Sequence, residues 1–232
     1  MKIYAISDLH ISTNTNKPMD IFGGNWVGYL DKIFADWNEK VTDDDIVLIG
    51  GDISWAMDIE DAKKDIQSFS NLNGKKVLIK GNHDYWWSGI GKVRDMLPED
   101  FFALQNDSIR FDGVVICGSR CWSVPGSPDF NEQDMKIYLR ETERLKLSLK
   151  SAQKLRQEGD KLIALIHYPP FNVKHDVSAF TDIFEQNAVD AVIYGHLHGK
   201  NVRADKLVIK NKIKYYLTSC DQTDNELREI EI

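Results

Sequence analysis

Short apolar runs recur along this chain, and each one is followed at once by residues that can bind a metal ion. The runs cover residues 2–7, 45–49, 75–80, 161–166 and 190–194. Runs of this length are typical of buried strands. In an open α/β sheet the carboxyl ends of the strands form one edge where ligands collect. The pattern therefore predicts an α/β fold in which polar residues far apart in the sequence meet at one site.

The residues that follow the runs are carboxylates, histidines and one asparagine. They stand in the segments Asp8-Leu9-His10, Gly51-Asp52, Gly81-Asn82-His83-Asp84, His167 and Gly195-His196-Leu197-His198. Two Asp, four His and one Asn, with no Cys, suit Mn²⁺, Fe²⁺, Co²⁺ or Zn²⁺ better than a thiolate zinc site or an all-oxygen calcium site. Seven ligands exceed the need of one tetrahedral ion, and with one bridging carboxylate they fit two ions about 3.5–4 Å apart.

Each of these residues also has a plain structural interpretation when it is taken alone. His10 or His167 would more often be structural than a ligand, and Asp8 or Asp52 could be a helix N-cap. Asn82 after a glycine could be a turn residue. Their joint occurrence, each at the end of a strand pattern, favours the metal site.

The order of these segments resembles the calcineurin-like metallophosphoesterase superfamily over residues 8–198. The resemblance implies a four-layer αββα sandwich and two divalent metal ions as cofactors, drawn from Mn, Fe, Zn and Co. It implies that Asp52 bridges the two ions. The first ion would take Asp8, His10, Asp52 and His198, and the second would take Asp52, Asn82, His167 and His196.

The resemblance also implies the chemistry. A hydroxide shared by the two ions would attack phosphorus in line, and His83 would face the leaving-group oxygen and donate a proton to it. His83 and Asp52 are then the catalytic residues, and Asn82 and His83 the substrate-binding residues.

One segment departs from the family pattern. The family commonly has Gly-Asp-x-x-Asp at the second motif, and its later Asp holds the catalytic imidazole, whereas this chain has Gly51-Asp52-Ile53-Ser54-Trp55. Candidates to replace that Asp are Asp58, Asp84 or a backbone carbonyl, and Asp84 is favoured weakly.

Helical patterns alternate with the apolar runs and predict helices at residues 26–37, 59–72, 89–97, 131–158 and 177–187. Between residues 101 and 118 the pattern changes to short runs, which predicts that a second, mixed sheet begins there. Turns are expected at Asp112-Gly113 and at Asn211-Lys212. Because no linker or repeat interrupts the chain, we expect one α/β domain over residues 1–232, with two packed mixed sheets and helices outside both.

Composition and hydropathy indicate which classes of partner and which cellular location to expect. A net charge of −7 argues against an extended nucleic acid, so a small phosphoester is the expected partner. No apolar stretch approaches the about 18 residues of a membrane span. The first residues run into a strand without a signal-peptide pattern, so no membrane partner and a cytoplasmic location are expected. Three cysteines are expected to be free thiols.

Three further features adjoin the expected site in sequence. Residues 122–130 form an irregular loop that can wall a substrate, and residues 85–87, Tyr-Trp-Trp, are more often core than a substrate platform. Arg120 is expected in a surface salt bridge rather than on a substrate phosphate, and His175 lies outside the metal pattern.

The sequence thus favours a phosphoesterase that hydrolyses phosphomonoesters or phosphodiesters of small molecules, with nucleotides as one class. A scaffold protein that has lost catalysis and a nuclease are the alternatives. The substrate, the choice between monoester and diester, the native metals and the oligomeric state stay open.

Overall fold

The computed structural model describes residues 1–232 except 14–16, 18, 129 and 203. Its first sheet has the strand order β11-β1-β2-β3-β4, and only β11 runs antiparallel to its neighbour. The strands are β1 (Ile3–Ile6), β2 (Ile46–Ile49), β3 (Lys75–Ile79), β4 (Phe101–Leu104) and β11 (Arg228–Glu229).

The second sheet has the order β5-β6-β7-β8-β10-β9, with a parallel centre and antiparallel strands at both edges. The strands are β5 (Asp107–Phe111), β6 (Val114–Ser119), β7 (Lys161–Ile166), β8 (Ala191–Tyr194), β9 (Leu207–Lys210) and β10 (Ile213–Leu217). Both predicted hairpin turns are present, because Phe111 pairs with Val114 and Lys210 with Ile213. The second sheet begins within the predicted range of residues 101–118, at β5, whereas the first run of that range, β4, pairs with β3 and belongs to the first sheet.

Five α-helices lie near the predicted ranges. They are α1 (Tyr29–Lys40), α2 (Ile59–Gln67), α3 (Ile90–Met96), α4 (Glu132–Leu155) and α5 (Ala179–Gln186), with short 3₁₀ turns at Met19–Phe22, Gly24–Trp26 and Cys220–Gln222. Asn131 and Ser178 each form a capping box at the start of α4 and α5, and Asp58 caps α2. These side chains fix where the helices begin.

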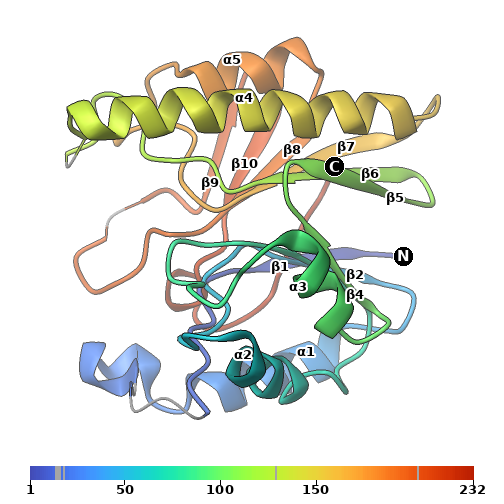
Figure 1. Cartoon of the computed structure of the whole chain (residues 1–232), viewed down its shortest axis with the longest axis vertical. Helices are drawn as coiled ribbons and strands as arrows, with labels where there is room; N and C mark the ends of the chain where they lie inside the picture. The colour runs from blue at the N-terminus through green and yellow to red at the C-terminus, as the bar shows by residue number, and fades with distance from the viewer. Residues whose placement is uncertain (14–16, 18, 129, 203) are drawn as a thin grey trace.

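Strand residues alternate between two cores, and this alternation creates the layers. Ala5, Leu48 and Ile116 pack into a core between the two sheets, whereas Ile6 and Cys117 face helices on the outer sides. Figure 1 shows α4 and α5 over the second sheet and α1 and α2 on the far side of the first. The predicted αββα sandwich is therefore confirmed. That residues 1–232 form one domain stays a prediction.

The two ends of the chain lie on the same side of the molecule. Strand β11 pairs with β1, and the backbone N–H of Ile230 donates to the carbonyl of Ile3. The loops that follow β1 and the central strands gather on the opposite side (Figure 1). All three cysteines are free and buried, as predicted. Across the described residues, none of the helices combines the length and apolar character needed to cross a bilayer.

Candidate metal centre

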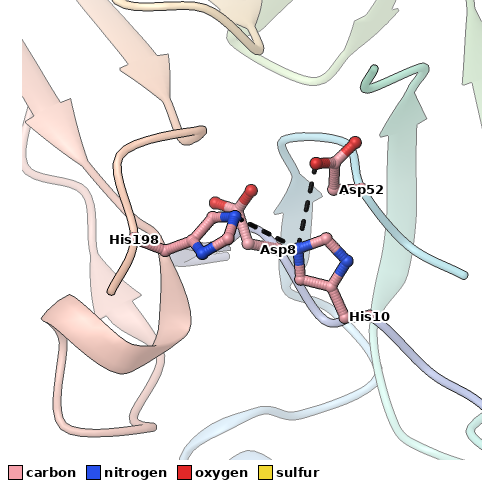
Figure 2. Close-up of side chains that lie close together, drawn as sticks. All are labelled: Asp8, His10, Asp52 and His198. Atoms are coloured by element: carbon pink, nitrogen blue, oxygen red, sulfur yellow. Dashed lines mark hydrogen bonds and ion pairs between the residues drawn. The ribbon is translucent and has the colours of Figure 1, made fainter. Parts of the chain in front are cut away.

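Four side chains from distant loops meet at the carboxyl ends of the strands. Asp8 and His10 follow β1, Asp52 follows β2 and His198 follows β8. One ligand atom from each lies within 4.8 Å of the others. In Figure 2, His10 and His198 point toward each other, with the two carboxylates beside them. The Nε2 atom of His10 is 3.4 Å from Nε2 of His198 and 3.8 Å from Oδ2 of Asp52.

A second group of polar atoms adjoins the first. The side-chain oxygen Oδ1 of Asn82 lies 2.7 Å from Nε2 of His167 and 2.9 Å from Nδ1 of His196. Oδ2 of Asp52 is 3.5 Å from Nε2 of His167, so this carboxylate borders both groups. The structure thus brings together all seven residues singled out in the sequence as metal ligands.

The hydrogen bonds of the second group leave lone pairs facing one another. Nδ1 of His167 lies 2.8 Å from the carbonyl of Gly50, which accepts only if that nitrogen carries the proton. Nε2 of His167 therefore presents a lone pair to the oxygen of Asn82. In the described part of the chain, Oδ2 of Asp52 is buried and has no hydrogen-bond donor. Converging acceptors of this kind fit a cation, and the donor set suits a borderline divalent ion.

Burial shifts the pKa values in the direction that metal binding needs from the histidines. It lowers the pKa of His167 to about 3 and holds those of His10, His196 and His198 below their ordinary value. These rings are therefore neutral near pH 7 and keep a lone pair for a ligand bond.

The pKa values of the two carboxylates are shifted in the opposite direction. Burial, and then the charge of Asp52, raises the pKa of Asp8 well above its ordinary value. Burial raises the pKa of Asp52 to about 6. Two adjacent buried acids without a compensating cation are unfavourable. A divalent ion would offset both desolvation and repulsion.

Comparison with known proteins agrees with this geometry. Residues 1–200 match the sequence model of the calcineurin-like phosphoesterases. The chain belongs to this family. It is 24% identical over 213 residues to an uncharacterized metallophosphoesterase of Helicobacter pylori, and the match covers 90% of this chain and 48% of the relative. It is 32% identical over 122 residues to the uncharacterized protein MJ1445 of Methanocaldococcus jannaschii, covering 50% of this chain and 68% of that protein. The chain spans about half the length of the Helicobacter relative.

Two solved structures share the fold. TT1561 of Thermus thermophilus aligns with a TM-score of 0.60 at 10% identity, covering 99% of this chain and 97% of that chain. AQ665 of Aquifex aeolicus, a protein of unknown function, aligns with a TM-score of 0.54 at 16% identity, covering 98% of this chain and 95% of that chain. At these identities the likeness concerns the fold alone.

In this calcineurin-like phosphoesterase, several of the gathered residues have a strained backbone. The φ angles of Asp8, His10, Asp52 and His196 are 60°, 47°, 53° and 70°. The backbone of residues other than glycine rarely adopts this left-handed region. Such strain concentrates at functional sites. Because none of the four begins a helix, the N-cap interpretation of Asp8 and Asp52 is wrong.

Glycines allow the loops of the site to approach one another. A Cβ atom on Gly81 would lie 2.2 Å from the backbone nitrogen of Asp52, and one on Gly195 would lie 2.6 Å from Oδ2 of Asp8. Both contacts are too short for any larger residue. Oδ2 of Asp8 also accepts from the backbone N–H of His196 at 3.0 Å, which joins the loops of the two sheets.

Asp84 holds the loop of Asp52, a role that sequence analysis missed. Its buried carboxylate accepts five hydrogen bonds between 2.7 and 3.2 Å, and the donors are the backbone N–H groups of Asp52, Ile53, Ser54 and Gly81 and the indole N–H of Trp86. Both oxygens are used in this way. The expectation that Asp84 orients His83 is therefore wrong.

The surroundings of His83 are aromatic. The ring centroid of Trp55 lies 4.6 Å from that of His83, and the hydroxyl of Tyr85 lies 3.5 Å from Nδ1 of His83. Asp58 caps α2 instead, so it is not the partner either. Burial lowers the pKa of His83, whose backbone N–H donates to Oδ1 of Asp52 at 2.7 Å. Trp55, which stands at the sequence position of the expected Asp, thus packs against His83 and cannot accept a hydrogen bond from it as a carboxylate would.

Arg120 adjoins the second group through its backbone, because its carbonyl accepts from the N–H of His167 at 3.1 Å. Its side chain forms the expected salt bridge, with Glu141 at 3.6 Å, and stacks on Trp122, but the pair is not a surface one because the carboxylate of Glu141 is buried. Trp86 and Trp87 are buried in the core, whereas Tyr85 is 53% exposed.

Proposed function

We propose that this protein is a divalent-metal-dependent phosphohydrolase that cleaves phosphomonoesters or phosphodiesters of small molecules, nucleotides included. The observation that carries the proposal is the position of Asp52, whose unpartnered oxygen borders both groups of acceptors. Two acceptor groups that share a carboxylate are the arrangement expected of a two-metal site. Two expectations from the sequence belong to the same proposal: a small phosphoester as the substrate and a cytoplasmic location for the protein.

The proposed ligands follow the two groups. The first ion would be held by Asp8, His10, Asp52 and His198, and the second by Asp52, Asn82, His167 and His196. The softness of these ligands suits Mn, Fe, Zn or Co. When bound, such ions supply an activated water nucleophile and neutralise charge on the phosphoryl oxygens.

The protein's own contribution to bond cleavage would come from His83. Its half-buried ring stands beside the proposed metal ligands, with the rings of Trp55 and Tyr85 near it. An imidazole N–H in this place can donate to the leaving-group oxygen, an effect worth about 10²–10⁴ in rate. Asn82 would help place the phosphoryl group through its side-chain N–H groups, because its oxygen is directed at the two second-group histidines.

The test combines metal content with turnover. We expect the purified protein to retain divalent metal by mass spectrometry and to hydrolyse p-nitrophenyl phosphate or bis-p-nitrophenyl phosphate with added Mn²⁺. Asp52→Asn should reduce turnover by at least about 100-fold, because it removes the charge shared by both ions. The matched control is Asp58→Asn, which keeps a capping side chain at an exposed helix end and should leave turnover unchanged.

Other results would point elsewhere. Wild-type turnover in Asp52→Asn would refute the mechanism. Absence of both metal and turnover would favour a scaffold protein, and cleavage of single-stranded DNA or RNA would favour a nuclease.

A further inference from the structure

A pocket of about 660 Å³ adjoins the second group of acceptors. Its walls come from the loops after β6, β7 and β8, and they include Ser127, Pro169, Val173, His196 and Val202. This volume lies within the range of about 300–1,000 Å³ that is usual for small-molecule sites. The pocket is therefore large enough for a substrate group.

The pocket adjoins the candidate metal centre through His196. His196 belongs to both, since its Nδ1 atom is 2.9 Å from Asn82 and the residue lines the pocket. Pro169 follows His167 by two residues and lines the same space. A phosphoryl group held at the centre would thus have this pocket beside it.

His83 faces a different part of the centre. Its ring packs near His10, Trp55 and Tyr85, and none of these four residues is in the described lining of the pocket. In an in-line displacement the leaving oxygen and the attacking oxygen occupy opposite sides of phosphorus. A group that departs toward His83 is therefore not the group that fills the pocket. The occupant must be attached to an oxygen that stays on phosphorus.

The walls indicate what kind of group fits. The described lining offers the apolar faces of prolines, valines and a leucine, with hydroxyl and amide groups from Ser123, Ser127 and Asn201. Its one carboxylate, that of Asp205, is largely exposed, and no lysine or arginine is among the described lining residues. Such walls suit an uncharged ring system with a few hydrogen-bonding groups better than a second phosphate.

We propose that this pocket binds an uncharged, nucleoside-sized ester group that remains on phosphorus, so that the preferred substrates are phosphodiesters. The inference rests on the proposed phosphohydrolase function. In the reaction, the oxygen of water bonds to phosphorus and the bond to the leaving oxygen breaks. The attacking water gives one proton to solvent, the leaving oxygen takes a proton from the imidazolium of His83, and His83 regains a proton from solvent. The retained group stays in the pocket as part of a monophosphate product.

The test keeps the leaving group constant and varies the retained group. The substrates are p-nitrophenyl phosphate, methyl p-nitrophenyl phosphate and thymidine 5′-(p-nitrophenyl phosphate). We expect kcat/KM to rise by about tenfold or more from the methyl to the thymidine diester, which corresponds to about 1.4 kcal/mol. Equal kcat/KM values for these two diesters would overturn the pocket assignment while leaving the phosphohydrolase function standing.

Matched variants locate the effect. Val173 is 75% exposed and lines the pocket, so Val173→Trp should fill it without disturbing the core. In this variant kcat/KM for the thymidine diester should fall to the value for the methyl diester. Val177 is 62% exposed and is not in the described lining, so Val177→Trp should keep the advantage. Equal losses in both variants would contradict the assignment.

A binding measurement separates this inference from the proposed function. Titration calorimetry with thymidine 5′-monophosphate should show binding to the wild type and to Val173→Ser, and weaker binding to Val173→Trp. If no substrate of the series is hydrolysed, the proposed function fails and this titration still decides whether the pocket binds a nucleoside group. Identical affinities in wild type and Val173→Trp would reject the pocket.

Discussion

Replacement of Asp84 should destabilise the loop that carries Asp52 and lower the free energy of unfolding. The Asp84 carboxylate is fully buried and accepts five N–H groups from two loops. In Asp84→Ala all five donors lose their acceptor. At about 1 kcal/mol for each, the lower end of the usual cost, the free energy of unfolding should fall by about 5 kcal/mol. Asp84→Asn keeps one acceptor oxygen and should lose about half of that amount.

Urea denaturation followed by circular dichroism measures these losses. The matched control is Asp58→Ala, whose exposed carboxylate accepts only two N–H groups at the start of α2 and should cost about 1 kcal/mol. Asp84→Ala should also bind Mn²⁺ more weakly than Asp58→Ala does. Equal stability losses in the two variants would refute the view that the hydrogen bonds of Asp84 hold the two loops together.

Three further predictions concern metal, protonation and the aromatic environment of the proposed acid. Mn²⁺ should raise Tm and EDTA should reverse the rise, and Mn²⁺ affinity by calorimetry should fall between pH 7 and pH 5, because Asp52, with a pKa of about 6, takes up a proton. Arg110→Gln should lower Tm at pH 7 and have little effect near about pH 2. The reason is that Arg110 holds the pKa of Asp160 below its ordinary value, so this stabilisation exists above the unfolded pKa of about 3.9 and is lost as pH falls through the folded-state pKa. Tyr85→Phe should slow alkyl esters more than p-nitrophenyl esters, because only a poor leaving group needs a well-oriented His83; equal slowing would contradict this role.

The sequence predicted the layers because strands buried on both faces leave continuous apolar runs, which can be recognised without long-range information. Apolar runs marked the strands, and helical patterns over residues 131–158 and 177–187 marked α4 and α5 to within a few residues of their ends. Sheet membership could not be predicted in the same way. Residues 101–104 form a short apolar run that could have paired in either sheet, and only packing assigns it to the first.

The positions at strand ends predicted that the seven site residues gather at one edge. The contacts that hold their loops in place could not be predicted from the sequence. The left-handed backbone at Asp8 and Asp52 leaves no trace in residue type, because it is imposed by the surrounding contacts. Asp84 adjoins His83 in sequence, yet its side chain turns to the backbone of another loop. The pocket was similarly hidden, since its walls come from three loops and include His175, which had no place in the motif pattern.

The pairing of β11 with β1 has a practical consequence for experiments on this protein. Both termini emerge at the side of the sandwich away from the loops of the centre (Figure 1). A molecule tethered to a sensor chip through either terminus would present the candidate metal centre to the flowing solution. A short peptide joining the two termini could also make a circularly permuted chain without obstructing that edge.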